Sequence, residues 1–112
     1  EEGEGVMEYA WGARYEGQFR NRKRHGSGVL LQASGDRLEG EWKDDRRHGR
    51  CKDFFADGSA FEGHMEEGQR CGHGVVVWPE GSTYSGLFEH GKANGQGRLV
   101  RTDGSIYEGQ FS

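Results

Sequence analysis

Large apolar and polar residues alternate in short stretches of the chain, with glycine at the centre of each stretch. Five segments share this arrangement: residues 15–19, 38–42, 61–65, 84–88 and 107–111. Alternation with a period of two is typical of a β-strand with one buried face. In the first segment, Tyr15, Gly17 and Phe19 therefore share one face, while Glu16 and Gln18 point to the other.

These segments recur every 23 residues without insertion or deletion, so the chain is a tandem repeat. A Gly-x-Gly motif has the same period, although Cys51 replaces the second glycine of the third copy. A further glycine recurs at residues 12, 35, 58, 81 and 104. Periodic glycine indicates a backbone geometry that other residues adopt poorly.

The repeating unit reads Tyr-x-Gly-x-Trp/Phe, a polar segment, Gly-x-Gly, a mixed segment and Asp-Gly-Ser. It resembles the MORN (membrane occupation and recognition nexus) repeat over residues 3–111. The resemblance implies antiparallel hairpins in one long, curved, single-layered sheet. It also implies a place in cytoskeletal or membrane-proximal assemblies.

The predicted fold is all-β: an elongated single-layer antiparallel sheet of about ten strands, one array over residues 1–112. Its five hairpins are predicted at residues 3–19, 26–42, 49–65, 72–88 and 95–111. Asp-Gly-Ser predicts a tight turn within each hairpin. The six-residue polar segments at 20–25, 43–48, 66–71 and 89–94 predict loops between hairpins. Ten strands at about 4.8 Å predict a length of roughly 45–50 Å. Because the chain ends at hairpin ends, we expect a segment of a longer array.

Composition agrees with a thin sheet and narrows the function. Apolar residues make up only 31% of the chain, 21 residues are glycine, and 3 Trp, 4 Tyr and 6 Phe supply the packing. The net charge of −4, with both signs interspersed, argues against nucleic acid as a partner. Two cysteines without a disulfide pattern favour a reducing, cytoplasmic setting, and the resemblance adds an association with the cytoskeleton.

The aromatic face of a single-layer sheet predicts a groove for a helix or an extended peptide of a protein partner. The predicted groove residues are Tyr9, Trp11, Tyr15, Phe19, Trp42, Phe55, Phe61, Trp78, Tyr84, Phe88 and Tyr107. The alternative is that these rings only cover one another. The edge strands 3–9 and 107–111 predict pairing with further repeats or with a second copy as a homodimer.

A lipid-binding module is the alternative function, because basic residues cluster in the polar segments. The predicted phosphoinositide-binding residues are Arg20, Arg22, Lys23, Arg24, Arg46 and Arg47. A cluster of this size predicts weak, salt-sensitive binding to anionic membranes.

No catalytic residues and no cofactor are predicted, because most carboxylates repeat at solvent-side positions such as Glu16 and Glu39. A zinc site between two chains is the remaining metal hypothesis, with His48, Cys51, Cys71 and His73 as ligands. Asp53 interrupts an apolar column of the inner face. It is predicted either to face water at the groove margin or to pair across the groove.

Overall fold

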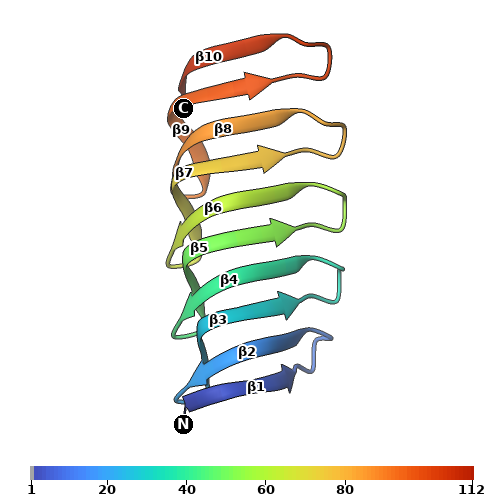
Figure 1. Ribbon diagram of the computed structural model, residues 1–112, viewed down its shortest axis with the longest axis vertical. Helices are drawn as coiled ribbons and strands as arrows, with labels where there is room; N and C mark the ends of the chain where they lie inside the picture. Colours follow the sequence, from blue (N-terminus) through green and yellow to red (C-terminus); the bar gives the residue numbers. More distant parts are fainter. Residues whose placement is uncertain (1) are drawn as a thin grey trace.

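Ten antiparallel strands form one sheet in chain order (Figure 1) in the computed structural model, which describes residues 2–112. The strands are β1 (Glu2–Glu8), β2 (Arg14–Arg20), β3 (Lys23–Leu31), β4 (Arg37–Lys43), β5 (Arg46–Phe54), β6 (Ala60–Glu66), β7 (Gln69–Val77), β8 (Thr83–Glu89), β9 (Lys92–Val100) and β10 (Ile106–Phe111). The predicted all-β, single-layer architecture is confirmed. The longest dimension of 49 Å agrees with the length expected from strand spacing.

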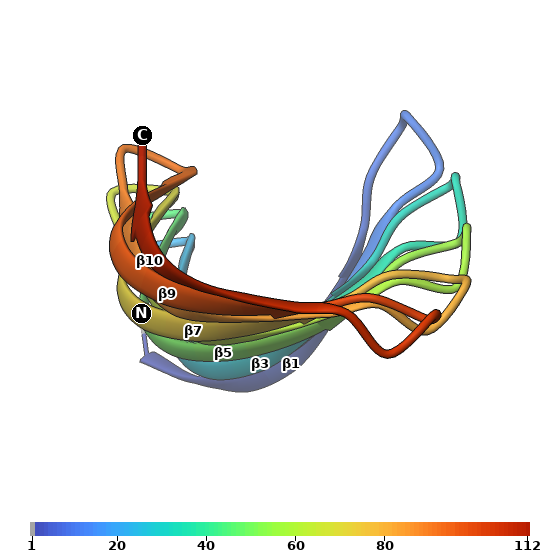
Figure 2. The ribbon, with the colours of Figure 1, turned by 90° about the horizontal axis from the view of Figure 1, so that it is seen from above.

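The sheet is bent into a trough and twists along its length (Figure 2). Extensive contacts join only strands that are neighbours in sequence, as expected of a repeat protein. The connections between β1 and β2 and their counterparts in later hairpins fan out along one side of the trough in Figure 2. The molecule therefore has two distinct faces, an inner face within the bend and an outer face behind it.

Aromatic rings pack against glycines on the inner face. The Tyr15 ring lies so close to Gly28 that a Cβ there would overlap it, and a Cβ at Gly74 would lie 2.8 Å from the Phe61 ring. Tyr84 covers Gly97 in the same way. In each case the ring precedes its glycine by 13 residues. The strict glycine period therefore reflects close approach of rings to the backbone.

The exception at Cys51 follows the same rule. Thirteen residues before it stands Leu38, where other repeats carry a tyrosine or phenylalanine. Leucine is shorter than an aromatic ring and leaves room for a side chain at the glycine position. Cys51 is buried there, so the two departures from the repeat pattern compensate each other.

The prediction of six-residue loops between hairpins is wrong. β2 continues to Arg20 and β3 begins at Lys23, so two residues make the connection. Asn21 and Arg22 have φ angles of 52° and 65°, and the equivalent Glu67 and Gly68 have 51° and 82°. Two consecutive left-handed residues form the type I′ turn that matches the twist of a hairpin. The prediction failed because polar side chains suggested a loop, whereas strand pairing extends to the turn itself.

The Asp-Gly-Ser segments form turns, as predicted, but these turns are the longer connection. Five residues, 55–59, separate β5 from β6. The Phe55 amide donates to the Ser59 carbonyl at 2.9 Å, and the Gly58 amide donates to the Phe55 carbonyl at 3.0 Å. Gly58 has a φ of 95°, which explains why glycine recurs at this position in every repeat of the chain.

A register shift recurs in every pairing between hairpins and orients Arg24 and the arginines at the equivalent position of later repeats. Gly17 pairs with Gly28 and Phe19 with Arg24, so three residues of β3 lie opposite Gln18 alone. The Gln18 side-chain oxygen accepts a hydrogen bond from the Ser27 amide at 2.9 Å. The irregularity places residue 24 beside Phe19 on the inner face.

Candidate functional site

The inner face holds two clusters of packed rings. Tyr15 meets Phe19 and Trp42 edge-on, with ring centroids 5.0 and 5.6 Å apart. Phe88 meets Phe61 and Tyr84 in the same way, at 5.4 and 5.3 Å. Edge-to-face geometry is the favoured arrangement of aromatic pairs. The Tyr15–Trp42 and Phe61–Phe88 contacts join neighbouring hairpins, and the two clusters make up the core of the sheet.

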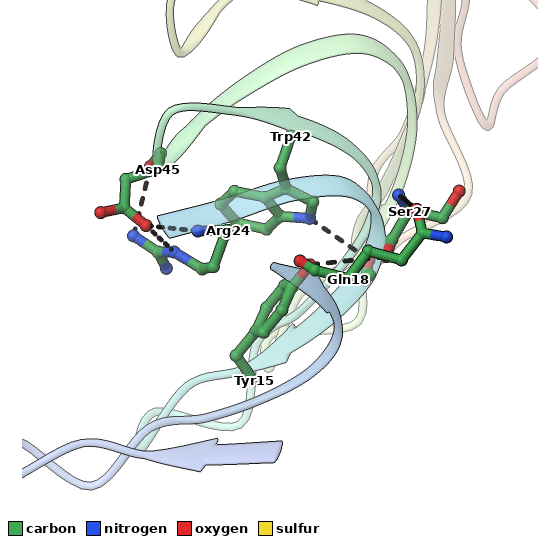
Figure 3. Close-up of polar contacts among 7 residues, drawn as sticks. Tyr15, Gln18, Arg24, Ser27, Trp42 and Asp45 are labelled. Atoms are coloured by element: carbon green, nitrogen blue, oxygen red, sulfur yellow. Dashed lines mark hydrogen bonds and ion pairs between the residues drawn. The ribbon is translucent and has the colours of Figure 1, made fainter. Parts of the chain in front are cut away.

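Hydrogen bonds hold the rings in place on the inner side of the bend (Figure 3). The Tyr15 hydroxyl donates to the Gln18 carbonyl at 2.9 Å, and the Trp42 indole nitrogen donates to the Gly28 carbonyl at 3.3 Å. The Tyr84 hydroxyl repeats the first bond with Leu87, at 2.8 Å. Burial raises the pKa of Tyr15 and Tyr84, so both phenols stay protonated as donors.

The structure divides the predicted groove residues into three groups. Buried in the core are Tyr15, Trp42, Phe61, Tyr84 and Phe88. Half-buried are Tyr9, Phe19 and Phe55. Exposed are Trp11, Trp78 and Tyr107. Trp42, a predicted groove residue, is not accessible to a partner, because Arg24 and Arg47 cover its ring. Five of the eleven predicted groove residues therefore belong to the core of the sheet.

Exposed aromatic surface remains at the rim, where the strands meet the five-residue connections. We call Tyr9, Trp11, Phe55 and Trp78 the aromatic rim. Trp11 is 59% exposed and Trp78 is 37% exposed. The Tyr9 and Trp11 rings are stacked, with centroids 4.3 Å apart and an interplanar angle of 19°. The exposed rings of Trp11 and Trp78 make the aromatic rim accessible to a partner.

A column of arginines runs between the rings. The Arg24 guanidinium, from β3, lies 4.7 Å from the Trp42 ring centroid. The Arg47 guanidinium, from β5, lies 5.1 Å from the same centroid. Arg70 lies 4.2 Å from the Phe61 ring. Cation–π contacts of this kind favour arginine over lysine. The interpretation of Arg24 and Arg47 as loop residues for lipid is corrected here, since both belong to strands and face inward.

Sequence reasoning missed Arg70 altogether. The signal that could have found it is the 23-residue spacing of Arg24, Arg47 and Arg70, which places all three at one position of the repeat. Counting alternate residues back from Gly28 or Gly74 also places this position on the inner face. The prediction stopped each strand at its first glycine and so excluded the arginine.

Each arginine of the column has a different electrostatic environment. Arg24 donates to Asp45 through its Nε at 3.1 Å and its backbone amide at 2.8 Å (Figure 3). Arg47 donates to Asp53 at 2.7 Å, with both side chains buried. The guanidinium of Arg70 makes no hydrogen bond or ion pair among residues 2–112, and burial lowers the pKa of Arg70. The positive charge of the column is therefore balanced in two repeats and left over in the third.

The Arg47–Asp53 pair decides between the two interpretations of Asp53. The Asp53 side chain is 1% exposed, so it does not face water at the groove margin. It pairs with Arg47, which also donates to the Glu39 carbonyl at 3.0 Å. Burial raises the pKa of Asp53, and the hydrogen bonds from Arg47 oppose this rise. The polar residue in the apolar column is thus matched by a polar residue from the same strand.

The predicted lipid-binding set is reduced by these contacts. Arg46 lies in an exposed ion pair with Glu67 at 3.1 Å. Arg20, Arg22 and Lys23 are exposed around the first two-residue turn. This turn is the remaining concentration of accessible positive charge in the predicted set.

The cysteines and histidines of the zinc hypothesis do not form a site within one chain. In the part of the chain that the structure describes, no three His, Cys, Asp or Glu side chains come together as metal ligands. Burial raises the pKa of the Cys51 thiol to about 11 and also raises that of Cys71, which disfavours the thiolate that zinc requires. The proposed site between two chains stays a prediction.

A model of the MORN repeat family matches five segments: residues 1–14, 15–37, 39–60, 61–83 and 84–106. A search among curated proteins found no match. Among residues 2–112, no helix is long and apolar enough to cross a membrane.

Proposed function

This chain belongs to the MORN repeat family, and from that membership we propose that it is a protein-binding module that helps to scaffold an assembly. MORN repeats suggest an interaction module for membranes, lipids or proteins, and the family is generally non-catalytic. The proposal takes a protein as the partner and places the assembly in the cytoplasm, at the cytoskeleton or close to a membrane.

The aromatic rim is the observation that carries the proposal. Tryptophan and tyrosine are enriched at the centres of protein interfaces, because they bury a large area with few rotatable bonds. Trp11 and Trp78 expose their rings, whereas Tyr15, Phe61 and Tyr84 on the inner face are buried. Their positions at the rim allow a helix or an extended peptide to contact several hairpins at once.

Electrostatics supports a protein over a lipid headgroup. Arg24 and Arg47 are held by carboxylates within the chain, and Arg46 is paired with Glu67. The accessible residues Arg20, Arg22 and Lys23 lie at one turn of one repeat. At about 1 kcal/mol per basic residue near an anionic surface, such a cluster binds weakly.

The experiment compares capture of partner proteins from cell extract by the wild type and by Trp11→Ala and Trp78→Ala. We expect each variant to lose the same partners, by about thirtyfold or more in affinity once a partner is purified, as for an interface hot spot. Leu87→Ala is the matched control, because Leu87 is also exposed but lies on the outer face.

Vesicles containing phosphatidylserine or a phosphoinositide test the lipid alternative in the same set of variants. Binding to vesicles that is lost in Arg22→Glu/Lys23→Glu but unchanged in Trp78→Ala, together with unchanged protein capture, would replace the proposal with the lipid-binding function. Retained capture in both tryptophan variants contradicts the role of the aromatic rim.

Self-association through sheet edges is part of the proposed scaffold. β1 and β10 each pair with one strand only within the described chain. Unpaired strand edges are templates for pairing with another chain. Sedimentation velocity at increasing concentration is expected to show species larger than a monomer. A strict monomer at high concentration contradicts this part of the proposal.

A further inference from the structure

The outer face of the sheet carries an exposed apolar ladder that the groove prediction overlooked. Leu31, Phe54, Val77 and Val100 occupy one position of the repeat, at the ends of β3, β5, β7 and β9. The first three are 45%, 41% and 39% exposed, and Val100 is half-buried. No second layer covers them in residues 2–112, since all ten strands belong to one sheet. We call these four residues the outer ladder.

A row of glutamates lies on the same face. In β2, for example, Arg14 pairs with Leu31 of the ladder, and Glu16 follows Arg14 by two residues. Glu16, Glu39 and Glu62 belong to β2, β4 and β6. Glu39 is paired with Arg37, whereas Glu16 and Glu62 have no ion-pair partner in the described chain. An open groove follows this row from β1 to β6. Its charged lining consists of Glu4, Glu16, Glu39, Glu41 and Glu62 against Arg50 and Lys52.

The spacing of the outer ladder matches one secondary structure. Successive members lie two strands apart, which is about 9.6 Å. Seven residues of an α-helix rise about 10.5 Å, so a helix parallel to the long axis can present one residue to each member. From Leu31 to Val100 the ladder spans six strand spacings, about 29 Å, and four helix residues spaced by seven span about 31 Å in a helix of about 22 residues. The twist seen in Figure 2 makes the ladder wind gently around this axis.

We propose that the outer ladder docks an α-helix of a partner protein, lying along the array. The helix carries an apolar residue at every seventh position and lysine or arginine along the flank that faces Glu16, Glu39 and Glu62. The apolar residues bury the outer ladder, and the basic flank neutralises the excess carboxylates of the groove. This adds a second face, and a partner of defined chemistry, to the proposed function.

Two other occupants fit this face less well. A second sheet packs through a broad apolar surface, but Arg37 lies between Leu31 and Phe54 in the row of the ladder. In the next row, glutamates stand opposite valines, so charge interrupts the apolar surface there too. An anionic membrane would be repelled by the carboxylates of that row. A single helix needs only one apolar stripe with a charged flank.

The test uses a synthetic, fluorescently labelled helical peptide of about 22 residues, with four leucines spaced by seven and lysine on one adjacent flank. Fluorescence anisotropy measures its binding to the 112-residue chain. Phe54→Lys and Val77→Lys are each expected to weaken binding about tenfold or more, since each places a positive charge in the apolar contact. Leu87→Lys is the matched control: it lies on the same face with 41% exposure but outside the outer ladder. Its binding is expected to be unchanged.

The charged flank is tested separately. Glu16→Gln/Glu62→Gln is expected to weaken binding several-fold at low salt and to reduce its salt dependence. Glu66→Gln/Glu89→Gln, which removes two exposed carboxylates at strand ends, is expected to change neither. Circular dichroism and thermal unfolding establish that each variant is folded before its binding is compared.

Several results would overturn the inference. Equal losses in Phe54→Lys and Leu87→Lys would show that the outer ladder has no special role. Equal binding of a peptide with the same composition but leucines distributed around the helix would remove the register argument. Phosphatidylserine vesicles that bind through Phe54 and Val77 while the peptide does not would favour a membrane. Trp78→Ala is expected to leave peptide binding unchanged, so this inference and the role of the aromatic rim can fail independently.

Discussion

At the residue scale, the main packing contact is an aromatic ring over a glycine that follows it by 13 residues. It occurs at Tyr15, Phe61 and Tyr84. A single-layer sheet has no second layer to bury its rings, so they are buried against the backbone of the neighbouring strand. A Cβ at the covered position would occupy the space of the ring. Glycine is therefore required by packing at these sites, independently of its φ angle.

Gly28→Ala tests this requirement. We expect it to lower the free energy of unfolding by about 1–3 kcal/mol, as overpacking of a core does. Gly5→Ala is the control at the same position of the first repeat, because a Cβ there would meet Phe19 at an ordinary 3.6 Å. Urea unfolding measures both. Equal stability of the two variants would show that the ring does not depend on the glycine.

Asp53 and Arg47 form the other residue-scale feature with a clear energetic consequence. Asp53→Leu is expected to lower the free energy of unfolding by about 3–5 kcal/mol, because it leaves the Arg47 charge buried without its partner. Asp53→Leu/Arg47→Met is expected to recover most of this loss, since apolar residues replace both charges. Chemical denaturation of the single and double variants gives the coupling between them.

The exposed pair of Arg46 and Glu67 is the control for that cycle. Glu67→Gln is expected to change stability by less than about 1 kcal/mol, because solvent screens the pair. A double variant no more stable than Asp53→Leu would contradict the assignment of the loss to an unpaired charge.

At the scale of elements, the two-residue turns determine how one hairpin follows the next. Asn21–Arg22 and Asp44–Asp45 adopt left-handed conformations without glycine, whereas the later turns carry Gly68 and Gly91. Asparagine and aspartate tolerate this conformation better than most residues. Backbone bonds also link successive turns, as the Gly91 amide donates to the Arg70 carbonyl at 3.0 Å. The turns are thus ordered parts of the sheet.

Gly91→Ala distinguishes such a turn from a flexible loop. The φ of Gly91 is 82° and no atom lies within 4 Å of a Cβ placed there. We therefore expect a loss of about 1–2 kcal/mol in the free energy of unfolding, due to backbone strain alone. Gln69→Ala, in a neighbouring strand end with a regular conformation, is expected to be nearly neutral in the same thermal or urea measurement. A flexible loop would tolerate both substitutions.

At the scale of the whole molecule, stability is a sum over neighbouring strands. Each strand contacts mainly the strands before and after it, so no single repeat is needed to close a core. The side-chain period of two makes the register between neighbours strict. Length and order of the array can therefore vary in steps of one repeat, but the pairing cannot shift by one residue.

Deletion of residues 63–85 removes one 23-residue repeat unit and joins equivalent positions. The product is expected to remain a folded β-protein whose longest dimension is about 10 Å shorter, or two strand spacings, by small-angle X-ray scattering. Deletion of residues 63–84 is the control, since the additional residue in mid-strand inverts the faces of the following segment. We expect that variant to be strongly destabilised by circular dichroism. Equal folding of both deletions would contradict strict register.

The sequence by itself determined the strands, their order and the length of the array. Alternation in Tyr15-Glu16-Gly17-Gln18-Phe19 and its 23-residue period were sufficient, because each repeat contacts only its neighbours and no long-range pairing has to be found. The same period contained Arg24, Arg47 and Arg70, although polarity alone suggested a loop for this position.

Only the tertiary structure decided which of these residues are accessible. Burial depends on how far a ring of one hairpin reaches over the next, and the sequence of a single strand does not contain that distance. The structure placed Trp42 beneath two arginines, paired Asp53 with Arg47 and left Trp11 and Trp78 exposed at the aromatic rim. The bend of the strands separated an inner face filled by its own rings from an outer face that nothing in the described chain covers.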